Sequence, residues 1–130
     1  MKKILLLTLV LLLAMALVAA CGGGSQEGAG GGGAAADPDV AAGKALFEQT
    51  TLAGNAGCIT CHSVEPGKTV VGPSLAGIGN KGEDFIRESI VNPDAQVAEG
   101  FPKGVMPKDY GEKLSEEQLN QLVKYLMTLK

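Results

Sequence analysis

Two cysteines and the only histidine of the chain form one compact group, Cys58-Ile-Thr-Cys61-His62. Two cysteines at this spacing, followed at once by histidine, are typical of covalent haem attachment. In a helix such residues lie about one turn apart on the same face, where two thiols can form thioethers with the two vinyl groups of one haem. The adjacent His62 imidazole then lies under the iron and becomes its proximal ligand. The pattern predicts one covalent haem c and single-electron chemistry.

Two other kinds of site use paired cysteines. A thioredoxin-like dithiol follows a strand in a βαβ unit, whereas the flanking stretches 54–57 and 63–67 have the composition of loops. A structural zinc ion needs four ligands, and the third cysteine, Cys21, lies far away in a different kind of segment. Haem attachment is the favoured interpretation, with a dithiol or a metal site as the alternatives.

A methionine is the expected second axial ligand of the haem iron, because the chain has no other histidine. Met1 and Met15 belong to the leading apolar segment, which leaves Met106 and Met127. Met127 adjoins the apolar stripe of a predicted helix, whereas Met106 lies in a loop rich in Gly and Pro, and the proline after it restricts its backbone. We expect Met106 to ligate the iron. The alternatives are an open sixth position and a hydrogen-bonded methionine beside bound water.

The first 20 residues have the pattern of an export signal. Lys2 and Lys3 precede an apolar run over 4–13, and small residues follow. Val-Ala-Ala before Cys21 resembles the cleavage box of a bacterial lipoprotein, so we expect lipid on Cys21 after the signal is removed. A plain secretory signal and an uncleaved anchor are the alternatives. Several acyl chains give stable anchoring, which predicts an exported protein held at the bacterial membrane on its periplasmic or extracytoplasmic side.

The composition changes twice after the signal. Residues 21–36 are dominated by Gly and Ala, as expected of a lipidated flexible tether. Residues 37–130 have the mixed composition of one small folded domain, to whose limited core a haem would add apolar mass. Without the two lysines of the signal, nine basic and fourteen acidic residues remain, a net charge near −5. This acidic balance argues against nucleic acid as a partner.

Three helices are expected in the domain. The first is capped by Asp37 and spans about 38–49, and the second spans about 83–91. The third follows Ser115, whose spacing to Gln118 is that of a capping box. No run of residues alternates well enough to predict a strand. The sequence therefore predicts an all-α domain with long loops.

In combination, these motifs over roughly residues 38–130 resemble a bacterial class I c-type cytochrome with one haem and His/Met ligation. Gly43 and Phe47 match the N-terminal helix of that family, and Leu122 and Tyr125 match the C-terminal helix that crosses it. The resemblance implies a small cytochrome c fold in which the terminal helices cross and loops wrap around one covalent haem. Glycine at the crossing lets two backbones approach closely.

The segment Gly-Pro-Ser-Leu over 72–75 also matches the family. By this resemblance, the carbonyl oxygen of Pro73 accepts a hydrogen bond from Nδ1 of His62 and fixes the imidazole tautomer, and Leu75 packs on the haem. The family's soluble members surround the exposed haem edge with lysines. Here acidic residues lie near the candidate lysines, so strong steering toward an acidic partner is not expected. The lysines are Lys68, Lys81, Lys103 and Lys108, and the acids are Glu99, Asp109 and Glu112.

The resemblance implies a membrane-anchored one-electron carrier of a respiratory or photosynthetic chain, and not an enzyme. Such a carrier accepts electrons from a quinol-oxidising complex and passes them to a terminal oxidase or a photosynthetic donor site. The main alternative is a fixed monohaem subunit of a membrane quinol-oxidising complex, of the alternative complex III type, or of an oxidase. A haem enzyme or gas sensor with an open haem face is disfavoured, because Met106 is well placed and no distal histidine is present.

Overall fold

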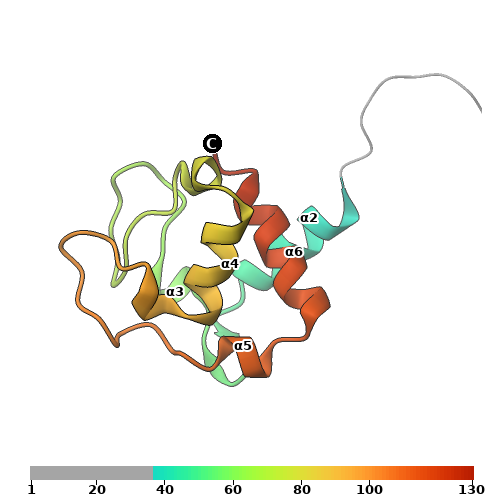
Figure 1. Ribbon diagram of the computed structural model, residues 1–130. Helices are drawn as coiled ribbons and strands as arrows, with labels where there is room; N and C mark the ends of the chain where they lie inside the picture. The colour runs from blue at the N-terminus through green and yellow to red at the C-terminus, as the bar shows by residue number, and fades with distance from the viewer. Residues whose placement is uncertain (1–36) are drawn as a thin grey trace, which may run out of the picture. The chain divides into compact units, whose positions relative to one another are not determined.

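The computed structural model describes residues 37–130 (Figure 1). The predicted export signal over 1–20 and the predicted tether over 21–36, with Cys21, lie outside these residues. Within the described domain, helices account for nearly all regular structure, beside one sheet of two very short strands. The all-α prediction is therefore confirmed. None of the described helices is long and apolar enough to cross a bilayer.

The first helix of the domain, α2 (Pro38–Phe47), begins where the sequence predicts. Asp37 caps it, because Oδ1 of this residue accepts the backbone N–H of Asp39 at 2.9 Å. Proline takes the first helical position, where no N–H is needed. The helix ends slightly before the predicted boundary, since the two β-branched threonines that follow favour extended backbone.

A hairpin of two-residue strands, β1 (Thr51–Leu52) and β2 (Asn55–Ala56), follows α2 and was not predicted. Its turn is formed by Ala53 and Gly54, which both have positive φ, 52° and 79°. Two-residue hairpin turns require this backbone, but alanine rarely adopts it. The composition of the turn therefore gave no signal for a hairpin.

The other elements are helices separated by loops. They are α3 (Cys58–Cys61), the 3-10 helix η1 (Ile78–Lys81), α4 (Glu83–Val91), the 3-10 helix η2 (Pro93–Ala95), α5 (Tyr110–Lys113) and α6 (Glu116–Met127). The predicted bounds of α4 are confirmed. The capping box of α6 is also confirmed: the Ser115 hydroxyl accepts the Gln118 N–H at 3.2 Å, and the Gln118 side chain accepts the Ser115 N–H at 3.0 Å.

Helices α2 and α6 cross (Figure 1), and Gly43 lies where their backbones approach most closely. A Cβ built on Gly43 would lie 1.8 Å from the backbone oxygen of Gln121, so no side chain fits between the helices at this point. Beside the crossing, the rings of Phe47 and Tyr125 pack with their centroids 5.5 Å apart. The helix crossing that the resemblance implies is present.

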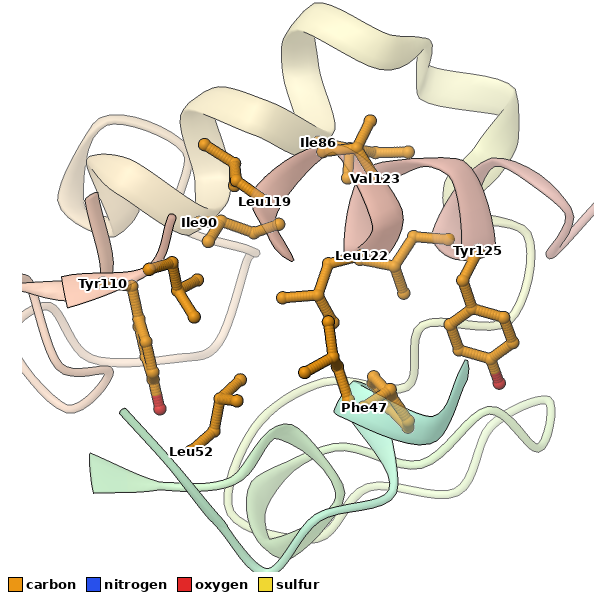
Figure 2. Close-up of a cluster of buried hydrophobic side chains, with 12 residues drawn as sticks. Phe47, Leu52, Ile86, Ile90, Tyr110, Leu119, Leu122, Val123 and Tyr125 are labelled. Atoms are coloured by element: carbon orange, nitrogen blue, oxygen red, sulfur yellow. The ribbon is translucent and has the colours of Figure 1, made fainter. Parts of the chain in front are cut away.

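One cluster of buried side chains joins these helices (Figure 2). Helix α4 packs on α6 and contributes Ile86 and Ile90, the hairpin contributes Leu52, and α5 contributes Tyr110. The remaining members come from α2, from α6 and from the residue before its cap. They are Leu46, Phe47, Leu114, Leu119, Leu122, Val123, Tyr125 and Leu126. This core supports two long loops, over 62–77 and 96–109, which Figure 1 draws at the left.

Candidate functional site

The predicted attachment group forms α3, a single helical turn that starts after Gly57. Glycine is required there, because a Cβ would lie 1.7 Å from the backbone oxygen of Gln49. The Gly57 N–H donates to the carbonyl of Thr50 at 2.8 Å. Cys58 and Cys61 stand one turn apart and line the same cavity as free thiols. Burial raises the pKa of the Cys58 thiol to about 11, so this thiol is protonated at neutral pH.

The His62 imidazole is oriented by the segment 71–73. The backbone N–H groups of Val71 and Gly72 both donate to the carbonyl of Cys61, at 3.2 and 2.7 Å, which brings this segment against the ring. Nδ1 of His62 donates to the carbonyl of Pro73 at 2.9 Å, the hydrogen bond that the resemblance implies. With the proton on Nδ1, the lone pair of Nε2 is available to a metal. A Cβ on Gly72 would lie 2.6 Å from Cε1 of the ring, so glycine is required beside it.

A cavity of about 650 Å³ lies between α3, the two long loops and the core. All the cofactor contacts predicted within 37–130 line it: Cys58, Cys61, His62, Pro73, Leu75 and Met106. The other walls are mostly apolar. This volume is typical of small-molecule and cofactor sites, and two thiols, one imidazole and one thioether among apolar walls suit a covalently attached haem. The side chains of this cavity therefore fit haem c.

Met106 reaches the cavity from the loop 96–109, which connects η2 to α5. Gly100 and Gly104 shape this loop, with φ angles of +84° and +78° that favour glycine. Met127, the other methionine of the domain, lies on α6 and packs against the buried core, outside the lining of the cavity. Of the two, Met106 is the one placed to contact a cofactor.

Asp109 and Tyr110 join the end of this loop to the hairpin, a connection that was not predicted. The Tyr110 hydroxyl donates to the carbonyl of Ala56, and the Tyr110 ring lines the cavity. Burial raises the pKa of Tyr110 to about 12, so the hydroxyl remains a donor at neutral pH. Nδ2 of Asn55 donates to Oδ1 of Asp109 at 2.6 Å. In the sequence, the feature that could have pointed to this connection is a tyrosine four residues after Met106.

Some of the charges around the cavity are paired, and part of its edge is apolar. Val71 and Val105 both line the cavity, yet they are 55% and 54% exposed, so they lie at its edge. Several of the nearby lysines have partners on the protein. Lys68 pairs with Glu65 at 2.9 Å, Lys108 pairs with Asp94, and Nζ of Lys81 lies 5.8 Å from the centre of the Phe85 ring. Of the four lysines expected near the exposed haem edge, Lys68 and Lys108 are thus paired with acids, whereas Lys81 and Lys103 form no ion pair among residues 37–130.

A protein-family model described as "Cytochrome c" matches residues 40–130, most of the chain and the whole lining of the cavity. Among curated proteins, "Cytochrome c oxidase subunit 2" of Bacillus sp. (strain PS3) is similar, at 31% identity over 108 residues. The match covers 72% of this chain and 27% of that protein. The chain thus spans a minor part of that relative's length.

Proposed function

Because this chain belongs to the cytochrome c family and is therefore a haem-based electron carrier with covalent haem c, we propose that it carries single electrons at a membrane surface in a respiratory or photosynthetic chain. Cys58 and Cys61 would form the thioether links to the haem, and His62 and Met106 would ligate its iron. One observation carries this assignment: all four side chains line a single, mostly apolar cavity. The proposed role is electron transfer, without catalysis of a further chemical step.

Each side chain has one task in this mechanism. Bound haem supplies an iron that gains and loses one electron. Cys58 and Cys61 tether the cofactor, so it stays with the protein in both oxidation states. His62 offers Nε2, and its hydrogen bond to Pro73 holds the ring in place and strengthens it as a donor. Leu75 contributes to the apolar wall that excludes water from the ligands.

Met106 and the apolar walls determine which oxidation state is favoured. A thioether ligand raises the reduction potential of haem iron, and burial among apolar groups disfavours the additional positive charge of the ferric state. Both effects stabilise the reduced protein. We therefore place this carrier at the oxidising end of a chain, between a quinol-oxidising complex and a terminal oxidase or photosynthetic donor site.

Replacing Met106 by leucine tests the ligand assignment, since leucine keeps the apolar volume and removes the sulfur. We expect Met106→Leu to lower the reduction potential and to let CO bind the ferrous protein. Met127→Leu is the matched control, because Met127 packs outside the cavity. Ready CO binding by the unmutated ferrous protein, or an equal change in both variants, contradicts the assignment.

The membrane anchor in this proposal is lipid on Cys21, joined to the haem domain by the tether over 21–36. The support is the export pattern of 1–20 and the small residues before Cys21. Covalent haem attachment takes place outside the bacterial cytoplasm, so an export signal and an attachment motif on one chain agree with each other. The tether would let the haem domain move near the membrane surface without leaving it.

A fixed subunit of a membrane complex is the second candidate function. The similarity to a protein named as an oxidase subunit favours an oxidase as the complex. A quinol-oxidising complex of the alternative complex III type suits the lipid anchor equally well. In either complex the haem would exchange electrons with a permanent neighbour, whereas a free carrier would meet its donor and acceptor in turn.

A further inference from the structure

Asp94 binds the loop that carries Met106 on both sides of that methionine. Oδ1 of Asp94 accepts the backbone N–H of Gly104 at 2.8 Å, and Oδ2 pairs with Nζ of Lys108. Gly104 lies two residues before Met106 and Lys108 lies two residues after it. We propose that Asp94 is a positioning residue, which holds the loop so that the Met106 thioether would ligate the haem iron.

The Asp94 carboxylate belongs to η2, a short segment that is well packed against the rest of the domain. η2 directly follows α4, and its first residue, Pro93, is buried. Backbone hydrogen bonds continue across this junction, from the Asn92 N–H to the carbonyl of Glu88 at 2.7 Å and from the Ala95 N–H to the carbonyl of Asn92 at 3.0 Å. Helix α4 in turn packs on α6 through buried isoleucines. The carboxylate therefore connects the loop to the hydrophobic core.

The loop has few other contacts that could hold its shape near Met106. Within the described part of the chain, the hydrogen bonds and ion pairs of residues 102–108 all go to Asp94. The two prolines of this stretch have no backbone N–H to donate. Gly104 has a φ of +78°, a backbone that most residues avoid. Met106 itself packs against the buried core, but without Asp94 the stretch would lose its polar attachment, and Met106 would spend more time away from the iron.

The charges favour this arrangement at neutral pH. The hydrogen bond from Lys108, followed by that from the Gly104 N–H, lowers the pKa of Asp94 below its usual value, so the carboxylate is ionised and accepts both bonds. Ion pairs exposed to solvent are weak, and the Lys108 side chain is 63% exposed. A backbone N–H bonded to a charged acceptor is the stronger contact. Loss of the Asp94 carboxylate should therefore loosen the loop around Met106 more than loss of the Lys108 amine.

The inference rests on the proposed role of Met106 as axial ligand, and imidazole added to the ferric, haem-loaded protein tests it. Imidazole occupies the iron only while Met106 is displaced, so its apparent affinity reports the displaced population. We expect Asp94→Ala to bind imidazole at least about tenfold more tightly than the unmutated protein, since hydrogen bonds to charged groups shift equilibria by that order. Asp94→Asn, which can still accept from Gly104, and Lys108→Ala should give smaller increases.

Asp84→Asn is the matched control. Asp84 lies in the first turn of α4 and is exposed, it does not line the cavity, and among residues 37–130 its side chain forms no hydrogen bond or ion pair. This substitution removes the same charge as Asp94→Asn but no contact with the loop, so imidazole affinity should stay at the unmutated value. Equal affinities for Asp94→Ala and Asp84→Asn would overturn the role of Asp94.

Two further comparisons distinguish a failure of the ligand assignment for Met106 from a failure of the positioning role for Asp94. If Met106→Leu binds imidazole no more tightly than the unmutated protein, Met106 is not the ligand, and the proposed function fails at that point. If Asp94→Ala has a lower melting temperature by circular dichroism but an unchanged imidazole affinity in the folded range, Asp94 is structural and the positioning role is overturned. Should Asp94→Ala not accumulate with haem, Asp94→Asn and Lys108→Ala provide the same comparison against Asp84→Asn.

Discussion

The imidazole of His62 and the backbone of Gly72 are packed so closely that no side chain fits between them. A Cβ on Gly72 would lie 2.6 Å from Cε1 and 2.9 Å from Nδ1 of the ring. We expect Gly72→Ala to turn the ring away from the carbonyl of Pro73, which shifts the reduction potential and lowers the free energy of unfolding by about 1–3 kcal/mol. Urea unfolding and redox titration of the haem-loaded protein measure both effects.

Val70→Ala is the comparison for this substitution, since Val70 lies in the same loop and is 53% exposed. It should change the free energy of unfolding by less than about 0.5 kcal/mol. If Gly72→Ala has the same free energy of unfolding and the same reduction potential as the unmutated protein, the ring has room to shift and the close packing does not affect function.

The chemistry-bearing residues of the cavity could be predicted because their types are rare in the domain. Residues 37–130 contain one histidine, two cysteines and two methionines, so spacing and loop composition suffice to choose Met106. Asp94 and Tyr110 could not be chosen in this way. The domain has many acids, and the bonding partners of these two residues are set by how the loop folds, for which no local pattern exists.

At the scale of the elements, the crossing of α2 and α6 depends on the missing side chain of Gly43. A Cβ there would meet backbone atoms of Gln121, which cannot move aside as a side chain can. We expect Gly43→Ala to push the helices apart and to lower the free energy of unfolding by about 1–3 kcal/mol or more. Urea unfolding followed by circular dichroism measures this, with Ala45→Ser, on the exposed side of α2, as the near-neutral control. Equal stability of both variants would contradict a close crossing.

Elements with a cap and a full apolar stripe were predictable, and the short ones were not. The start of α2 and the start of α6 follow from the side-chain caps at Asp37 and Ser115. Helix α5 has only four residues and no side-chain cap, so neither periodicity nor capping could indicate it. The hairpin turn at Ala53 was likewise without a signal. These short elements are held by tertiary contacts such as the hydrogen bond from Tyr110 to Ala56.

At the scale of the whole molecule, the proposed attachment to a membrane depends on Cys21. We expect Cys21→Ser to release haem-loaded protein into the soluble extracytoplasmic fraction, because the acyl chains that provide stable anchoring would be absent. The unmutated protein should stay with the membranes until detergent is added. Cell fractionation followed by haem staining measures the distribution. Retention of Cys21→Ser in the membranes at the mass of the unmutated mature protein would contradict a lipid anchor, whereas a mass increased by the signal would show that the signal was not removed.

Gentle detergent extraction of the unmutated protein distinguishes the two candidate functions. Stoichiometric recovery of oxidase or quinol-oxidising subunits with this chain would identify it as a fixed component of that complex. Recovery of the chain alone, with its haem intact and reducible, would identify a tethered carrier that meets its partners transiently. Two of the lysines near the cavity, Lys68 and Lys108, are paired with acids, which weakens charge attraction to a partner there.

The hydrogen bonds of Asn55 and Tyr110 join the hairpin to the start of α5. The hairpin leads into the segment that carries His62, and α5 directly follows the loop that carries Met106. The two proposed ligands thus belong to one braced frame, which we expect to keep its geometry when the charge on the iron changes. An electron transfer that displaces few atoms has a small reorganisation energy, and each 1.4 kcal/mol or so taken from the activation barrier makes the transfer about tenfold faster. We therefore expect the bracing between these two short elements to favour rapid entry and exit of an electron.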